Sequence, residues 1–283
     1  MKSIKKITGL LMSLLLFVGI FAGCGNSGSS GAAAGNASKL EEIKKRGTVR
    51  IGVFSDKPPF GYVDSNGKNQ GYDVYIAKRI AKDLLGDENK VEFVLVEAAS
   101  RVEFLQSDKV DIILANFTVT DERKEVVDFA NPYMKVALGV VSKDGAIKSV
   151  DDLKGKKLLV NKGTTAETYF TENYPDIELL KFDQNTETFE ALKDGRGDAL
   201  AHDNTLLFAW ARENKGFEVG VPSLGEQDTI APAVKKGNTD LLEWLNTEID
   251  TLNSNGFTKE AYDATLLPAY GDSIDPSQIL VEK

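Results

Sequence analysis

Residues 111–129 read DIILANFTVTDERKEVVDF, and this stretch decides the fold because a buried strand meets a polar loop within it. The apolar run ends at Ala115, the polar segment NFTVTDER follows, and a charged segment comes after it. A short apolar run bounded by polar residues is typical of a strand buried on both faces. Asn116, Thr118 and Arg123 therefore follow a strand end, which is where open α/β sheets bind ligands.

Strands and helices alternate on both sides of this stretch. The first part predicts helices at 40–47, 72–86 and 100–110, and strands at 48–54, 90–98 and 111–117. The second part predicts strands at 156–163, 177–183, 198–204 and 217–221, and helices at 164–175, 185–197, 205–216 and 238–266. Such alternation predicts mostly parallel sheets with helices on their faces.

Two apolar extended runs, 134–143 and 228–237, fall between these parts. We expect the chain to cross between two lobes near 136–142 and 229–235. Lobe one would comprise 39–137 and 233–283, and lobe two 138–232. Two such lobes facing each other make a cleft that a hinge closes.

The N-terminus has the plan of a secretory signal, predicted over residues 1–23. Lysines at positions 2, 5 and 6 precede an apolar run over 9–23, which is too short to cross about 30 Å of hydrocarbon comfortably. The segment FAGC resembles the bacterial lipobox, so we expect Cys24 to be lipid-modified and to anchor the protein on the outer or periplasmic side of the cell membrane. Residues 24–38, rich in Gly, Ser and Ala, predict a flexible tether.

Composition excludes several classes of protein. The net charge of -9 over 283 residues argues against nucleic-acid binding, which needs a basic surface. One cysteine, Cys24, allows no disulfide within the chain, and with a single histidine, His202, it supplies no soft metal site. We therefore expect neither metal nor cofactor.

The predicted strand ends bring complementary groups to one cleft. Arg123 suits a carboxylate, and Thr164 and Thr165 begin a helix whose free N–H groups favour the same anion. Asp203, with Asn116 or Thr118, would accept hydrogen bonds from an ammonium group. A carboxylate and an ammonium group held close together describe a free α-amino acid.

Each of these residues also has a structural interpretation. Thr164 would be a plain helix cap, Arg123 a surface ion pair with Asp121 or Glu122, and Asp203 a cap for the helix that follows it. Their coincidence at successive strand ends favours the binding site.

Several motifs, in this order and spacing, resemble the family 3 extracellular solute-binding proteins of ABC importers. They are Gly71-Tyr72-Asp73-Val74, FTVTDER (117–123), KGTT (162–165) and AHD (201–203), within a resemblance that covers about 39–271. It implies a two-lobed, hinge-closing periplasmic-binding-protein-like fold of type II, with two mostly parallel sheets and two crossover strands. It also implies a carboxylate clamp of Arg123, Thr118 and Thr165, and an ammonium site of Asp203 and Asn116. Tyr75 departs from the pattern, because an acidic residue usually stands there.

The identity of the amino acid rests on the resemblance. Arg101 stands where many of these receptors have an aromatic residue, and an arginine there resembles receptors for acidic amino acids. Longer sequence segments, including DKPPFGYVDSNGKNQGYD (56–73) and GTTAETYFTENYP (163–175), are similar to the cysteine-binding lipoproteins of the family. We favour cysteine over glutamate or aspartate. The predicted side-chain pocket comprises Phe54, Lys57, Phe60 and Tyr62.

Other functions stay open at this point. A dehydratase of cyclic acids would need a placed acid or base, and His202 is expected instead to be a strand residue that faces the lobe interior or lines the cleft edge. A sensor or adhesin would use the same amino-acid site to report to a membrane partner. The resemblance favours a monomer that delivers its ligand to the permease of an ABC importer.

Overall fold

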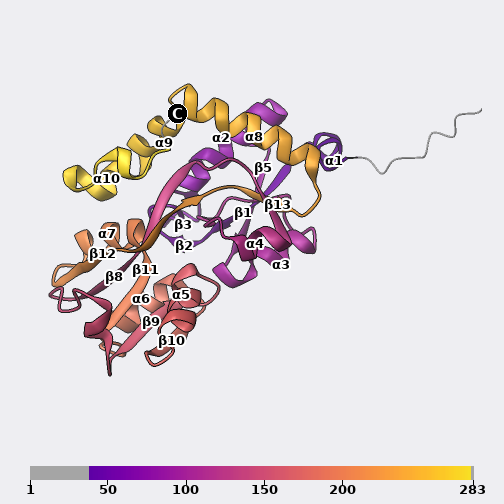
Figure 1. Cartoon of the computed structure of the whole chain (residues 1–283). Coiled ribbons are helices and arrows are strands. Elements are labelled where there is room, and N and C mark those ends of the chain that lie inside the picture. Colours follow the sequence, from indigo (N-terminus) through magenta and orange to yellow (C-terminus); the bar gives the residue numbers. More distant parts are fainter. Residues whose placement is uncertain (1–37, 282–283) are drawn as a thin grey trace, which may run out of the picture. The chain divides into compact units, whose positions relative to one another are not determined.

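The computed structural model describes residues 38–281. The predicted signal peptide, Cys24 and nearly all of the predicted tether lie outside the described residues. Residues 38–281 belong to one compact unit, in which each of two five-stranded sheets is flanked by helices (Figure 1). The predicted two-lobed α/β fold is confirmed. We call the parts around the two sheets lobe one and lobe two.

Lobe one contains the sheet β5-β1-β6-β13-β7. Its strands are β1 (Val49–Phe54), β5 (Val91–Val96), β6 (Ile112–Ile113), β7 (Val127–Phe129) and β13 (Ala233–Lys235). A small sheet follows β1, made of β2 (Asp56–Lys57), β3 (Gly61–Val63) and β4 (Asn69–Gln70). The helices are α1 (Lys39–Arg46), α2 (Tyr72–Leu85), α3 (Arg101–Gln106) and α4 (Asp121–Val126), with the 3-10 turn η1 (Ala98–Ser100) before α3.

Lobe two contains the sheet β10-β9-β11-β8-β12. Its strands are β8 (Met134–Lys143), β9 (Lys157–Asn161), β10 (Glu178–Phe182), β11 (Ala199–Asp203) and β12 (Phe217–Ile230). The helices are α5 (Thr165–Asn173), α6 (Asn185–Lys193) and α7 (Asn204–Glu213), and the 3-10 turn η2 (Val150–Leu153) precedes β9.

The sheets are mixed, because the crossover strands run against the parallel ones. In lobe one β5, β1 and β6 are parallel, whereas β13 pairs antiparallel with β6 and β7. In lobe two β10, β9 and β11 are parallel, whereas β8 pairs antiparallel with β11 and β12. The predicted strand at 217–221 continues to Ile230 with register shifts, so β8 and β12 form a long ribbon between the lobes (Figure 1).

The C-terminal part is helical, as predicted, but it is not one helix. It contains α8 (Thr239–Ser254), α9 (Phe257–Thr265), α10 (Leu267–Tyr270) and the 3-10 turns η3 (Gly271–Ser273) and η4 (Pro276–Gln278). The break falls at Gly256, whose φ of 85° is left-handed and ends a helix. After α9 the chain contacts lobe two, because Tyr270 donates to the Thr205 carbonyl at 3.1 Å. Within residues 38–281, no helix has the length and apolar character needed to cross a bilayer.

Packing in lobe one explains the Gly71-Tyr72-Asp73-Val74 motif. Tyr72 is fully buried at the start of α2, and Tyr75 donates to Glu260 on α9 at 2.7 Å. Asp73 is also fully buried, and its carboxylate accepts from the Asn116 backbone N–H at 2.8 Å and from the Tyr133 hydroxyl at 2.7 Å. Asp73 therefore fixes the backbone of Asn116, whose φ of 45° is left-handed.

Burial raises the pKa of Asp73 to about 7, although Tyr133 and Lys57 act in the opposite direction. Because the folded state then holds a proton that the unfolded state releases near pH 4, this residue stabilises the fold most at low pH. Its contribution is lost as the pH rises through about 7.

We expect the substitution Asp73→Asn to remove this pH dependence, because an amide keeps the shape and one acceptor without titrating. Relative to this variant, the free energy of unfolding of the wild type should fall by up to about 4 kcal/mol between pH 4 and pH 8. Urea titrations of both proteins across that range measure the difference. A difference that does not change with pH would show that Asp73 is ionised throughout.

Candidate functional site

A small cavity lies between the lobes, where the carboxyl ends of β1, β6, β9 and β11 meet. It has a free volume of about 10 Å³, roughly the space of one water molecule. Its lining contains every residue predicted for the site except Phe60 and Tyr62, and adds two others. The lining residues are Phe54, Lys57, Ala98, Arg101, Asn116, Thr118, Arg123, Thr164, Thr165, His202 and Asp203.

An ion pair between the lobes occupies the middle of this site. The Lys57 ammonium of lobe one lies 2.7 Å from Asp203 Oδ2 of lobe two and 2.6 Å from Asn116 Oδ1. Lys57 is 1% exposed and Asp203 4%. The Lys57 nitrogen also lies 5.2 Å from the ring centre of Phe54 and 5.8 Å from that of Phe60. Removing either partner of so deeply buried a pair would leave the other charge uncompensated, which is strongly destabilising.

Asp203 ends β11 and precedes α7, yet its side chain makes no capping hydrogen bond. The structural interpretation of Asp203 as a helix cap therefore does not account for its carboxylate. Burial alone would raise the pKa of Asp203, but the Lys57 ammonium lowers it well below its usual value, so the carboxylate is ionised.

His202 lies beside Asp203 and is 1% exposed. Its Nδ1 accepts from the Asp203 backbone N–H at 2.7 Å. Burial and the nearby Lys57 ammonium lower the pKa of His202, so the ring is neutral. This hydrogen bond supports the end of β11, and the other ring nitrogen, Nε2, is buried and has no hydrogen-bond partner among residues 38–281.

Arg101 is held by carbonyl oxygens from both lobes. It donates to Ala98 at 3.0 Å, Ala115 at 3.1 Å, Asn116 at 3.3 Å and, across the cleft, Gly163 at 3.1 Å. Burial lowers the pKa of Arg101, and the neighbouring Arg123 acts in the same direction. Most of the N–H donors of its guanidinium are therefore engaged by neutral carbonyl acceptors.

Arg123 is less completely engaged. It donates to the Thr118 carbonyl at 2.7 Å and to the Gly163 carbonyl at 3.0 Å, and no ion pair to Asp121 or Glu122 forms in the described part of the chain. Burial lowers the pKa of Arg123 to about 10, so it is a cation at neutral pH. The guanidinium carbons of Arg101 and Arg123 lie 4.2 and 4.6 Å from the ring centre of Phe117. This buried ring orients both cations.

Thr164 is the cap of α5, as its structural interpretation predicts. Its hydroxyl accepts from the Glu167 N–H at 3.3 Å and donates to the Asn161 carbonyl at 2.7 Å. Thr165 is the first residue of that helix, so the helix start faces the cavity with Thr165 on its lining. On the opposite side, Asn116 Nδ2 is buried and has no hydrogen-bond partner among residues 38–281. The site thus combines a free amide donor, an arginine and a helix start.

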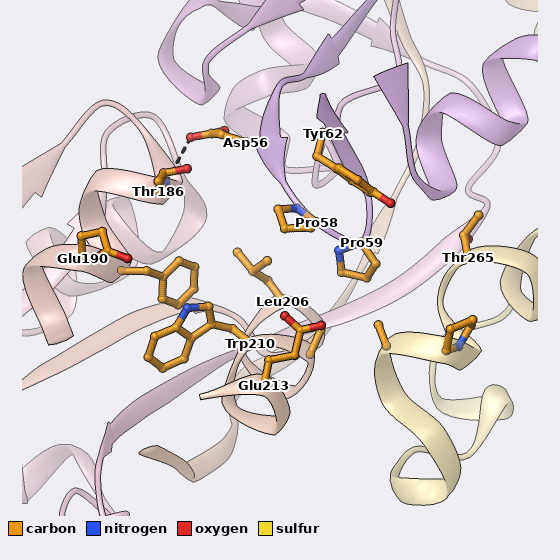
Figure 2. A pocket seen from close by; sticks show the side chains of 14 residues that line it. Asp56, Pro58, Pro59, Tyr62, Thr186, Glu190, Leu206, Trp210, Glu213 and Thr265 are labelled. Atoms are coloured by element: carbon orange, nitrogen blue, oxygen red, sulfur yellow. Dashed lines mark hydrogen bonds between the residues drawn. The ribbon is translucent and has the colours of Figure 1, made fainter. Parts of the chain in front are cut away.

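Phe60 and Tyr62 lie elsewhere, because the turns between β2 and β4 direct them away from the cavity. Phe60 is fully buried in the core of lobe one, behind Lys57. Tyr62 lines a separate, larger cavity of about 350 Å³ between the β2–β3 segment, α6, α7 and the end of α9 (Figure 2). There Asp56 already accepts from Asn185 at 2.9 Å and Thr186 at 3.2 Å, so this cavity offers a poorer match to a zwitterion.

Ala98 and Gly163 were not predicted for the site, and His202 was expected either to face the lobe interior or to line the cleft edge. Ala98 and His202 line the cavity, and Gly163 accepts from both arginines. Gly163 has a φ of 72°, and a Cβ there would lie 2.6 Å from the Ala99 Cα on the other lobe. Its position in KGTT, just before the predicted helix start, was the only signal for it. No cluster of three or more His, Cys, Asp or Glu side chains suited to a metal occurs within residues 38–281.

Several known proteins with similar chains are amino-acid-binding proteins by name. The ABC transporter glutamine-binding protein GlnH of Bacillus subtilis is 40% identical over 264 residues, which cover 91% of this chain and 96% of that protein. The crystal structure of the solute receptor for L-cysteine of Neisseria gonorrhoeae has a TM-score of 0.85 and 63% identity, over 87% of this chain and all of that one. The cysteine-binding protein from Campylobacter jejuni has a TM-score of 0.85 and 61% identity, with the same coverage.

Residues 49–266 match the profile of the bacterial extracellular solute-binding proteins, family 3, which spans both sheets and every residue that lines the cavity. The strand order, the long β8–β12 ribbon and the cleft agree with that match. The chain belongs to the bacterial extracellular solute-binding proteins of family 3.

Proposed function

We propose that this protein binds free cysteine in the cavity between its lobes and delivers it to the permease of an ABC importer. The observation that carries the proposal is the set of complementary groups in one buried cavity: Arg123 and the Asn116 amide for a carboxylate, and Asp203 for an ammonium group. An α-amino acid needs both kinds of group at short separation.

The carboxylate would meet Arg123, the Asn116 Nδ2 donor and the start of α5 at Thr165. An arginine binds a carboxylate through two parallel hydrogen bonds, and a helix start adds free N–H groups and a favourable dipole. The hydroxyl of Thr118, which is 3% exposed, lies on the same lining. The ammonium group would take the place on Asp203 and Asn116 Oδ1 that the Lys57 ammonium now holds.

Cysteine is favoured over other amino acids by two observations. The solute receptor for L-cysteine is 63% identical, whereas the glutamine-binding relative is 40% identical. The lining also offers little room, with Phe54, Ala98 and Lys57 close to the charged groups. Glutamate or aspartate is the second candidate, because Lys57, Arg101 and Arg123 outnumber the single carboxylate on the lining.

Ligand entry requires the lobes to separate. A free volume of about 10 Å³ does not admit an amino acid, and the lobes touch through Gly163. The β8–β12 ribbon supplies the hinge, and contacts made only after closure would drive the population toward the closed form. The permease would then recognise the closed form.

We place this activity at the cell membrane. A lipid on Cys24 would anchor the body to the cell membrane on its outer or periplasmic side, and the protein would act there as a monomer. The same binding chemistry would serve a sensor or adhesin, and transport assays with the partner permease separate these roles. The buried, neutral His202 supports a receptor rather than a dehydratase.

A thermal-shift screen of the chain from residue 25 on, against all common amino acids and cystine under controlled redox conditions, tests the ligand. A ligand that binds only the folded state raises the unfolding midpoint by mass action. We expect cysteine to give the largest shift. A shift with glutamate or aspartate alone would replace cysteine by the second candidate, and no shift with any amino acid would refute the receptor assignment.

We expect Arg123→Ala to weaken cysteine binding by about 2–5 kcal/mol, because the ligand carboxylate loses its charged partner inside a buried site. Lys124→Ala on the same helix is the matched control, since among residues 38–281 the Lys124 side chain pairs only with exposed Asp121 and does not line the cavity. Calorimetric titration measures both. Equal affinities for the two variants would remove Arg123 from the carboxylate site.

We expect Gly163→Ala to weaken binding by roughly tenfold or more, about 1.4 kcal/mol, because the added Cβ meets the Ala99 backbone and keeps the lobes apart. Gly155→Ala controls for backbone strain: it has the same φ of 72°, and its Cβ would meet nothing within 4 Å. Both variants should lose about 1 kcal/mol of stability from the left-handed backbone. If both kept wild-type affinity, closure at Gly163 would not contribute to binding.

A further inference from the structure

Lys57 is a buried lysine whose charge has one carboxylate partner on the cavity lining. Its ammonium contacts Asp203 and Asn116 at 2.7 and 2.6 Å. Its other near neighbours, Phe54 and Phe60, are aromatic rings. Lys57 lies on β2 in lobe one, and its ion pair with Asp203 connects it to lobe two.

The charges around the cavity do not balance. Lys57 from β2, Arg101 from α3 and Arg123 from α4 face it, whereas β11 contributes one carboxylate, Asp203, and the neutral His202. Asp73 of α2 lies behind Asn116, where it is bonded to the Asn116 backbone and to Tyr133, and it does not line the cavity. Asp228 of β12 lines only the neighbouring surface groove beside Arg123.

Two of the three cations are accounted for without an extra anion. Arg101 donates to four carbonyl oxygens and lies over Phe117, so neutral acceptors satisfy it. Arg123 is the partner for the ligand carboxylate under the proposed function. Lys57 remains. Among residues 38–281 its one ion pair is with Asp203, the carboxylate that the ligand ammonium would take, and Asp73 acts on it only from a distance.

A ligand with a neutral side chain would leave the Lys57 ammonium buried without an anion. Burial lowers the pKa of Lys57, and Asp203 opposes this effect. Without that carboxylate, Lys57 would have to keep its charge at a large cost in free energy or lose its proton. A ligand that carries a second negative charge close to its own ammonium group avoids this loss. In cysteine the sulfur is separated from the α-nitrogen by two carbons, so a thiolate lies next to the place that the Lys57 nitrogen gives up.

We infer that the protein binds cysteine as its thiolate and that Lys57 is the counter-ion of the sulfur. This inference rests on the proposed function and adds the ionisation state of the ligand and the residue that selects it. The thiol releases its proton to solvent on binding, Lys57 keeps its three protons, and no bond other than S–H breaks. Thiolates are stabilised beside lysine and arginine in this way in many proteins.

Ultraviolet difference spectroscopy tests the inference directly. The chain from residue 25 on contains no cysteine, because Cys24 is the only one in the sequence, so any thiolate absorption belongs to the ligand. At pH 6.5 to 7, free cysteine is mostly a neutral thiol, whose pKa is about 8.5. We expect the thiolate band to appear on mixing in proportion to the bound fraction.

The pH dependence gives a second readout that needs no variant. The apparent affinity for cysteine should rise by up to about tenfold per pH unit below the free thiol's pKa of about 8.5, because one proton leaves on binding. Serine has the same shape and does not ionise, so its weaker binding should lack this dependence. The ratio of the two affinities cancels the titration of Asp73 and other protein groups.

The variant Lys57→Met keeps the length of the side chain and removes the charge. We expect it to abolish the thiolate band and to reduce cysteine affinity by at least tenfold, while serine affinity stays the same or rises. The thermal unfolding midpoint shows whether the variant is folded, and if it is not, the wild-type spectrum and pH profile decide.

The outcomes separate this inference from the proposed function. Cysteine binding without a thiolate band and with a flat cysteine-to-serine ratio would overturn the inference and leave the cysteine receptor intact. No cysteine binding at all would overturn both. Binding of glutamate or aspartate instead would overturn the thiolate and assign Lys57 to a carboxylate.

Discussion

The ion pair between Lys57 and Asp203 is the interaction on which the site depends. It joins the lobes inside a cavity whose lining has three cations and one carboxylate. A pair so deeply buried gives little net stability, because desolvation offsets most of the attraction. The pair matters because it positions groups of the site. It keeps Asp203 ionised, and it holds the Asn116 oxygen and the Asp203 carboxylate around one point that suits an ammonium group.

The arrangement of strand ends was predictable from the sequence. Each apolar run that reads as a strand is followed by the polar residues that line the cavity, because parallel strands deliver their carboxyl ends to one edge of a sheet. Asn116, Arg123, Thr165 and Asp203 were found by this rule. The lengths of the strands were less predictable from the sequence. In the run at 111–117 only Ile112–Ile113 form a strand, and Asn116 adopts a left-handed backbone conformation soon after it.

Side-chain direction in the loops was not predictable. The segment after β1 folds into a three-stranded sheet of short strands, and its turns send Lys57 into the cavity, Phe60 into the core and Tyr62 to another cavity. Composition marks all three as candidates for a pocket, but period-two patterns need longer strands to assign faces. Gly163 was not predicted for a different reason. Its role is an approach between lobes, and no local pattern encodes a contact with Ala99.

The cation surplus gives the site a means of rejecting ligands as well as attracting them. A cleft with matched charges would accept any zwitterion that fits, and it would separate amino acids mainly by size. If the ligand binds as proposed, a neutral side chain would leave Lys57 without a carboxylate partner, and discrimination would come from a penalty on the wrong ligand. The site would then separate a glutamine side chain, which is a neutral amide, from the thiolate of the proposed ligand, although a glutamine-binding protein and a cysteine receptor are both similar to this chain. Specificity within one fold would follow from the charge on a single buried side chain rather than from a new architecture.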